Sequence, residues 1–250
     1  MNWSIWNHLV LQLSNREPFI HDSCVAIGAL LKAVELTEST FGDEAPGSNA
    51  HSLQMAKMHR EYALLKYGKA VKAMQAALVG AALRQVLIAC LLVYCFENLL
   101  SNRHMALSHV ETGEHLLREW LVKYDQVIPN NRHVHSPAPA IIDDELVEAF
   151  DHIDLQISTI YDSRPLELHE ASISEGLTVV QRLPSTFKDL SEAQRYLVVI
   201  MRRSHHFLAT TVWIPWLLTS FVIYSKYSIL FLNHGLVSCT LETGRSFFCP

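Results

Sequence analysis

The feature that most constrains the fold is an apolar stretch near the middle of the chain, VLIACLLVYCFENLL, residues 86–100. Arg84 and Glu97 are the only charged residues between Lys72 and Arg103. A helix that is apolar on every side must be covered by other elements. This stretch is shorter than the roughly 20 residues that a membrane-spanning helix needs. It therefore predicts a buried central helix of an all-α domain.

Apolar residues recur at helical spacing through most of the chain before residue 207. These patterns predict further helices at residues 3–14, 19–36, 51–79, 105–124 and 143–164, and one that begins at 190. We expect loops at residues 37–52 and 129–139, and irregular structure at 166–187. Successive helix pairs are typical of a multi-helix bundle or a short α-solenoid-like array of antiparallel pairs. In such a fold, the amphipathic helix at 106–124 would pack on the central helix.

The helix expected at residues 51–79 carries two apolar stripes and one basic face. The first stripe is Met55, Met58, Tyr62 and Leu65, and the second is Ala63, Tyr67, Ala70 and Met74. The basic face holds Lys57, Arg60, Lys66, Lys69 and Lys72, with Glu61 as the one acid among them. Because no aromatic residues interleave with these bases for stacking, we interpret the face as solvated and not as a nucleic-acid patch.

Charge and cysteine usage narrow the class of protein. The formal net charge of -5 provides no global field that would draw the chain to nucleic acid. Cysteines stand at positions 24, 90, 95, 239 and 249, an odd number without any CxxC pair. This usage indicates buried thiols in a reducing compartment and no cysteine-based zinc site. The N-terminus lacks the basic start and continuous apolar run of a signal peptide.

No sequence motif points to catalysis. The chain has no GxSxG, no HExxH and no phosphate-binding glycine loop. His109 and His115 are six residues apart on the helix expected at 105–124, so they lie on different faces. His205 and His206 are adjacent and cannot chelate from one helical face. We therefore expect no catalytic residue, no cofactor and no metal ligand, with a histidine-based enzyme as an alternative left open.

A polar set lies within the apolar helix expected at 143–164: Asp154, Gln156, Asp162 and Arg164. One interpretation is contact with a small ligand or a partner. The interpretation that we favour is a structural network, in which Arg164 stands at the helix C-terminus and pairs with a carboxylate. A half-buried carboxylate without a partner would be costly.

Several stretches of the chain, in this order, resemble the C-terminal regulatory region of fungal binuclear-zinc-cluster transcription factors. They are PFIHDSCVAIGALLKA (18–33), YALLKYGKAVKAM (62–74), VLIACLLVYCFENLLSN (86–102), ALSHVETGEHLL (106–117), HIDLQISTIYDSRP (152–165) and PSTFKDLSEAQRYL (184–197). The resemblance implies an all-α regulatory domain over residues 1–206 of a nuclear protein. It implies transcription regulation through protein partners or a small effector, with a secondary-metabolite gene cluster as the setting.

The same resemblance implies which partner this chain needs. Regulators of this family read DNA with a separate module that binds two zinc ions through six cysteines, and the sequence lacks that cysteine pattern. We therefore expect no direct nucleic-acid contact. The expected partners are proteins of the transcription machinery or a DNA-binding partner.

The C-terminal segment, residues 207–250, differs from the rest of the chain. Residues 207–225 contain no Asp, Glu, Lys or Arg, and their length suits a membrane span. A membrane-anchored helical adaptor is thus the alternative function. The segment could also be a buried terminal helix kinked at Pro215. A third reading is a truncated or misread end, because residues 224–250 keep no period of 3.6 or 2.

Overall fold

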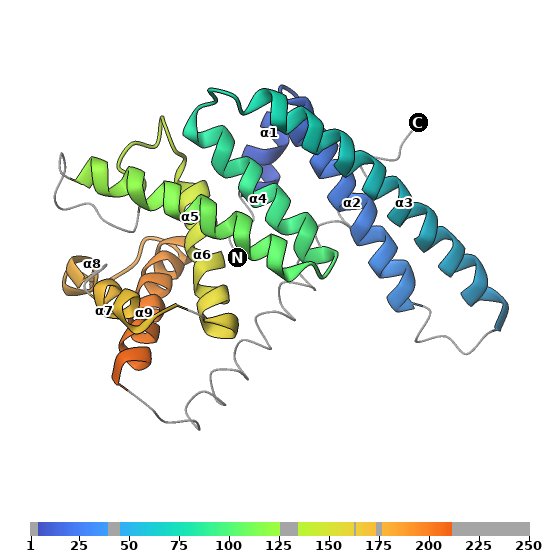
Figure 1. Ribbon diagram of the computed structural model, residues 1–250. Helices are drawn as coiled ribbons and strands as arrows, with labels where there is room; N and C mark the ends of the chain where they lie inside the picture. Colours follow the sequence, from blue (N-terminus) through green and yellow to red (C-terminus); the bar gives the residue numbers. More distant parts are fainter. Residues whose placement is uncertain (1–4, 40–45, 126–134, 163, 174–176, 212–250) are drawn as a thin grey trace. The chain divides into compact units, whose positions relative to one another are not determined.

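The structure is a computed structural model of the chain, and it describes residues 5–39, 46–125, 135–162, 164–173 and 177–211 (Figure 1). All regular structure in these residues is helical, which confirms the all-α prediction. The elements are η1 (Ile5–Val10, a π-helix), α1 (Leu11–Ser14), α2 (Pro18–Ser39), α3 (Pro46–Ala77), α4 (Leu83–Leu99), α5 (Arg103–Asp125), α6 (Asp144–Tyr161), α7 (Leu166–Ser172), α8 (Leu177–Gln181) and α9 (Leu190–Thr211).

The described residues form two compact units that divide within α5. One unit runs from Trp6 to Gly113, and the other begins at Glu114 and includes α9. The domain boundary expected at residue 206 falls inside α9, which continues to Thr211. None of the described helices combines the length and the apolarity needed to cross a membrane. Residues 212–225 of the segment proposed as a membrane span lie outside the described residues.

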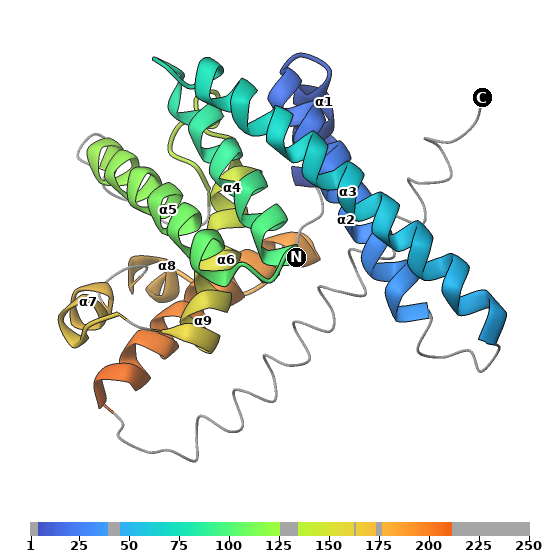
Figure 2. The same cartoon turned by 45° about the vertical axis from the view of Figure 1, so that its right-hand side comes forward.

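In the first unit, α2 and α3 lie side by side as an antiparallel pair (Figures 1 and 2). Small residues mark the seam at seven-residue spacing. Ala26 and Ala33 are buried on α2, as are Ala56, Ala63 and Ala70 on α3. Residues seven apart lie on one face of a helix, and small side chains there let two helix backbones approach closely. The second of the two predicted α3 stripes, which contains Ala63 and Ala70, is therefore the packed one.

The first predicted stripe lies at the surface. Met58, Tyr62 and Leu65 are 53%, 47% and 60% exposed. The loop predicted at 37–52 is wrong at both ends, because α2 continues to Ser39 and α3 begins at Pro46. Proline suits the first turn of a helix, where its missing N–H costs no hydrogen bond. Pro46 thus begins the helix that we had placed after it.

A larger residue in the α2–α3 seam should destabilise the protein. Ala63 is fully buried, so an Ala63→Met substitution would push the two helices apart and should lower the free energy of unfolding by about 1–3 kcal/mol. Ala76→Met makes the same change at an exposed position of α3 and should alter it by no more than about 0.5 kcal/mol. Urea denaturation followed by circular dichroism measures both. Equal effects of the two substitutions would contradict close packing at Ala63.

The central helix is confirmed as α4. Each residue from Leu87 to Val93 is buried, which is the all-round burial that the apolar stretch predicts. Its principal helix neighbour among the described residues is α2. The packing of α5 on α4 stays a prediction. The amphipathic pattern of α5 itself is confirmed, because Ala106, Val110 and Leu117 are buried.

One buried acid ends the apolar part of α4. Glu97 is 8% exposed, and each of its carboxylate oxygens accepts a hydrogen bond. Tyr67 Oη donates to Oε1 at 2.8 Å, and Asn102 Nδ2 donates to Oε2 at 2.7 Å. The Tyr67 ring also stacks on Phe96, with the ring centroids 3.8 Å apart. The carboxylate therefore joins α3 to the turn after α4, and its burial is balanced by two donors.

In the second unit, α9 packs against α6, α7 and α8. Helices α7 and α8 correct the prediction of irregular structure at 166–187, although Leu183–Phe187 is non-helical as expected. Helix α6 ends at Tyr161, before the predicted end at Arg164. The Asp162 carboxylate accepts the Arg164 backbone N–H at 3.2 Å. This local turn offers the backbone an alternative to a further helical turn.

Candidate functional site

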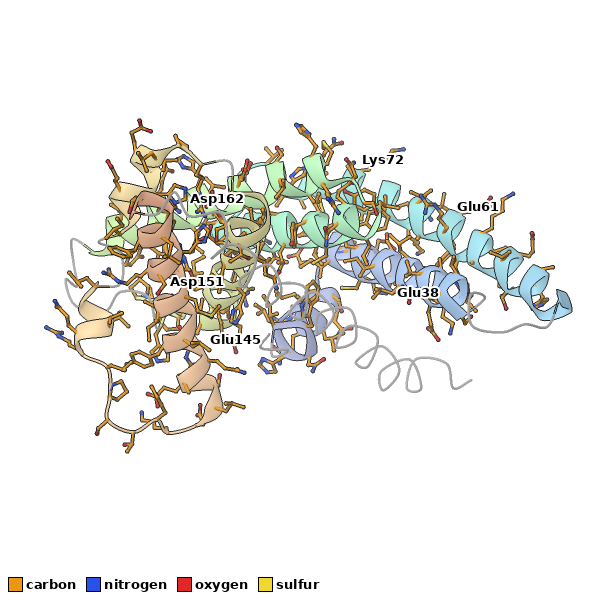
Figure 3. All side chains as sticks on the ribbon, turned by 90° about the horizontal axis from the view of Figure 1, so that it is seen from below. Glu38, Glu61, Lys72, Glu145, Asp151 and Asp162 are labelled. Carbon is orange, nitrogen blue, oxygen red and sulfur yellow. The ribbon has the colours of Figure 1, made fainter. Side chains whose placement is uncertain are left out.

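The candidate site lies where the C-terminal end of α6, the short helix α7 and the middle of α9 meet. Figure 3 labels Asp151 and Asp162, two acids of the site. Pro165 precedes α7 with an extended backbone, so the chain leaves α6 at Asp162 and turns directly into the next helix. On α9, positions 202, 205 and 206 share one face at helical spacing. Three short sequence segments thus bring charged and imidazole side chains together.

Asp154 is the buried centre of an ion-pair network. It is 4% exposed, and two guanidinium groups reach its two oxygens. Arg164 Nη1 donates to Oδ1 at 3.0 Å, and Arg202 Nη2 lies 2.9 Å from Oδ2. Arg202 Nη1 also pairs with the Asp151 carboxylate, one turn earlier on α6. Buried charges persist when they are paired in this way.

Asp162 is the second carboxylate that Arg164 holds. Arg164 Nε donates to Oδ1 at 2.9 Å, and Nη2 donates to Oδ2 at 3.3 Å. Two imidazole nitrogens approach the same Oδ2 from other helices. His205 Nε2 lies 2.6 Å from it and His169 Nε2 lies 3.4 Å from it. One carboxylate oxygen is therefore shared by α6, α7 and α9.

The electrostatics of the site keep both aspartates ionised. Burial alone would raise the pKa of Asp154, but the charges of Arg202 and Arg164 outweigh it and lower that pKa. Burial likewise acts against ionisation of Asp162, where hydrogen bonds from His205 and Arg164 prevail and lower the pKa. Paired carboxylates of this kind stabilise the folded state at neutral pH, and that contribution is lost as the pH falls through their lowered pKa values.

His169 and His206 form a buried pair behind Asp162. They are 5% and 4% exposed, and their Nδ1 atoms lie 3.0 Å apart, which is a hydrogen-bond distance. Burial and then the positive charge of Arg164 lower the pKa of His206 to about 4. His206 is therefore neutral at physiological pH.

Glu114 on α5 is a half-buried acid with one oxygen that lacks a hydrogen-bond donor. Its Oε1 is buried and has no hydrogen-bond partner among the described residues. Burial, followed by the negative charge of Asp154, raises the pKa of Glu114 to about 8, although Arg202 and Arg118 act in the opposite direction. The side chain is thus a neutral carboxylic acid at pH 7, in contrast to Asp154 beside it.

The structure brings together three members of the polar set that the sequence analysis identified. Asp154, Asp162 and Arg164 are directly bonded in the network. The Gln156 side chain takes no part in these bonds, and its backbone oxygen accepts a hydrogen bond from Thr159. Residues two apart point to nearly opposite sides of a helix, so Asp154 and Gln156 cannot serve one site.

The network partners on α5, α7 and α9 were not predicted from the sequence. They are Glu114, His169, Arg202, His205 and His206, of which His205 and His206 were considered only as an adjacent pair. The two rings serve different partners, Asp162 and His169. The available signal was the spacing of three and four residues from Arg202, which places both histidines on one face of α9.

The remaining sequence candidates lie outside this network. His115 is paired with Glu119 on the exposed side of α5. Cys24, Cys90 and Cys95 are free thiols whose pKa values burial raises to about 11, about 11 and about 12. Thiols that resist ionisation are poor nucleophiles and poor metal ligands. The three thiols therefore agree with the interpretation that these cysteines pack in the apolar interior.

Comparison of the chain with protein-family models, with curated proteins and with solved structures finds no match.

Proposed function

We propose that this chain is a transcription-regulator-like protein that acts in the nucleus through its helical domain by binding a protein partner. The six sequence stretches that resemble the regulatory region of fungal zinc-cluster factors support this proposal, and the all-α fold agrees with it. The setting of secondary metabolism rests on the resemblance alone. The proposal places direct DNA contact in a partner and not in these residues.

The observation that carries the proposal is the exposed apolar stripe on α3, defined as Met58, Tyr62 and Leu65. These side chains are about half exposed although they are large and apolar. They stand at spacings of four and three, so they form one line along the helix. Aligned anchors of this kind are what a helix uses to hold a partner segment.

The charges around the stripe indicate the chemistry of the partner. Lys69 and Lys72 continue the same line one and two turns further along α3, and Lys57 and Arg60 flank it. Figure 3 labels Lys72 and also Glu61, the one acid at this face. A basic rim around apolar anchors complements a segment with apolar and acidic side chains. We assign the stripe to an acidic amphipathic helix of a partner protein.

A small effector remains part of the proposal at a different place. An open hollow of about 490 Å³ is lined by Gln12, Leu13, Asn15, Arg16 and Arg84. It contains none of the residues of the α6–α7–α9 network. Two arginines at its wall suit an anionic small molecule.

A tethered reporter assay tests the proposed function. The full chain, fused to an unrelated DNA-binding module in a fungal reporter strain, should change reporter transcription at least fivefold relative to that module alone. Replacing Met58, Tyr62 and Leu65 together with serine should abolish the change, because the apolar anchors are lost. The charge reversals Lys69→Glu and Lys72→Glu should weaken it as well, since an acidic partner would then be repelled.

Matched controls separate the stripe from general surface effects. Leu183, Leu190 and Leu197 are 45%, 75% and 51% exposed, and their joint replacement with serine should leave the reporter unchanged. Immunoblotting and circular dichroism of each variant report abundance and folding. If the unaltered chain leaves transcription at the level of the module alone, the regulator proposal is wrong. If the unaltered chain is active and the folded stripe variant keeps full activity, the assignment of this surface is wrong.

A further inference from the structure

The side chains of Asp162, His169 and His205 converge on one point. Asp162 follows the last residue of α6, His169 lies on α7 and His205 lies on α9. One ligand atom of each lies within 4.8 Å of the others. In the part of the chain that the structure describes, this is the one group of at least three His, Cys, Asp or Glu side chains that converges so closely. Their side chains are only 15%, 6% and 14% exposed.

Two tautomers of His169 fit its contacts. Its Nδ1 faces His206 Nδ1 at 3.0 Å, and its Nε2 faces Asp162 Oδ2 at 3.4 Å. A neutral imidazole carries one N–H and one lone pair. When Nδ1 donates to His206, the Nε2 lone pair points at the carboxylate oxygen, which is the arrangement that a metal ion between them requires. When His206 donates to Nδ1, the Nε2–H of the neutral ring donates to Asp162, and the group needs no metal ion.

We propose that Asp162 Oδ2, His169 Nε2 and His205 Nε2 bind a divalent transition-metal ion, with zinc as the expected ion. Two imidazoles and one carboxylate are ligands that zinc takes at about 2.0–2.2 Å, and three protein ligands leave a fourth position open. Calcium and magnesium prefer a shell made of oxygen atoms. No cysteine takes part, so the site is chemically distinct from a thiolate zinc cluster.

The distances suit this geometry with a small adjustment. Two ligand atoms on one tetrahedral zinc ion lie about 3.4 Å apart. The distance from His169 Nε2 to Asp162 Oδ2 already has that value. The distance from His205 Nε2 to the same oxygen is 2.6 Å, so the His205 ring must withdraw by somewhat less than 1 Å. His205 stands on the regular helix α9, where rotation of its side chain provides this movement.

Neighbouring side chains hold the ligands in orientation. Arg164 fixes the Asp162 carboxylate through Nε and Nη2, and His206 meets the far ring nitrogen of His169. Metal sites depend on such supporting bonds, which set the tautomer and the ring orientation of the ligands. The positive charge of Arg164 also lowers the affinity for any cation. The competing occupant is a proton on His169, which would make the group a plain ion-pair network.

Titration of the purified full chain tests the site. After removal of bound metal with a chelator, the chain should bind one equivalent of zinc in competition with a chromogenic indicator. Added Co²⁺ should give the visible absorption of a tetrahedral site with nitrogen and oxygen ligands. His169→Gln and His205→Gln should each weaken zinc binding by more than about 100-fold, because even loss of a supporting partner costs 10–100-fold. His115→Gln, at an exposed position of α5, should bind as the unaltered chain does.

Zinc binding by the unaltered chain tests the proposal even if a variant does not fold. Circular dichroism establishes which variants are folded. If the unaltered chain binds less than one equivalent of zinc and gives no tetrahedral Co²⁺ spectrum, the proposal is wrong and the cluster holds a proton. If folded His169→Gln and His205→Gln bind zinc as tightly as the unaltered chain, the metal lies elsewhere and the assignment is equally overturned.

Discussion

Replacing Arg202 with methionine should lower the free energy of unfolding by about 3–5 kcal/mol, which is the cost of breaking a buried ion pair by removing one partner. Arg202 Nη1 pairs with Asp151 and Nη2 lies 2.9 Å from Asp154 Oδ2. Methionine retains the packing of the aliphatic stem but leaves both carboxylates short of a cation. Arg164 stays on Asp154 Oδ1 and cannot replace the missing contact on Oδ2. Chemical denaturation followed by circular dichroism measures the loss.

The control for this experiment is Arg182→Met, which makes the same change at an exposed position of the same unit. Surface changes of that kind alter stability by no more than about 0.5 kcal/mol. Adding Asp154→Leu to Arg202→Met should recover part of the loss, because an apolar side chain in place of a buried charge needs no partner. If Arg202→Met is as mild as Arg182→Met, solvent screens the two carboxylates and the network is not a source of stability.

The parts of the fold that the sequence predicts are those set by local periodicity. The central helix α4 follows from a run without charge, and its residues from Leu87 to Val93 are indeed buried. The inward face of α5 follows from steps of three and four residues that end in Leu117. Such patterns depend only on neighbours in the same helix, so no knowledge of the tertiary structure is needed to see them.

The α2–α3 seam depends on a partner helix, and the sequence of α3 alone does not tell which of its two apolar stripes is packed. Hydrophobicity alone favours Met58, Tyr62 and Leu65 over a line of alanines. The structure exposes the large side chains and buries Ala63 and Ala70, because α2 presents its own alanines at the same spacing. The choice between two stripes is made by the surface that each one meets, and that surface is coded elsewhere in the chain.

The candidate site depends even more on residues that are distant in the sequence. Asp162 and Arg164 are two residues apart, and their pairing could be anticipated from the helix end. His205 is 43 positions from Asp162 along the chain, and no local pattern links them. The network is assembled by the packing of α7 and α9 against each other and of α6 against α9. Such residues can be identified from the sequence only by determining which polar side chains share the inward face of each amphipathic helix.

Glu114→Gln should make the protein more stable at alkaline pH and remove most of the pH dependence between pH 6.5 and 8. Burial raises the pKa of Glu114 to about 8 in the folded state, from 4.5 as its ordinary value. The folded state therefore holds this proton more tightly than the unfolded state does. Its contribution is fully present below pH 4.5 and is lost as the pH rises through 8, at up to about 1.4 kcal/mol per pH unit. Glutamine reproduces the neutral acid and keeps its size.

The pKa shifts of other groups limit the pH range in which the effect of Glu114 on stability can be measured. The lowered pKa of His206, about 4, makes the folded state less stable as the pH falls from 6.5 towards 4, which opposes the contribution of Glu114 there. Asp154 and Asp162 lose their stabilising charge only at more acidic pH. Between pH 6.5 and 8, Glu114 is the half-buried carboxyl whose ionisation still changes, so the slope in that range belongs to it. The raised pKa values of the thiols of Cys24, Cys90 and Cys95 lower the stability mainly above pH 8.

Denaturation of the unaltered chain at pH 6.5 and pH 8 should show a loss of about 1.5 kcal/mol, and Glu114→Gln should show less than a third of that loss. Glu111→Gln makes the same substitution on the exposed side of α5 and should follow the unaltered chain at both pH values. A Glu114→Gln variant with the same slope as the unaltered chain would mean that Glu114 is already ionised at pH 6.5. The Asp154 network would then tolerate a fourth carboxylate, because Arg118 and Arg202 would together neutralise it.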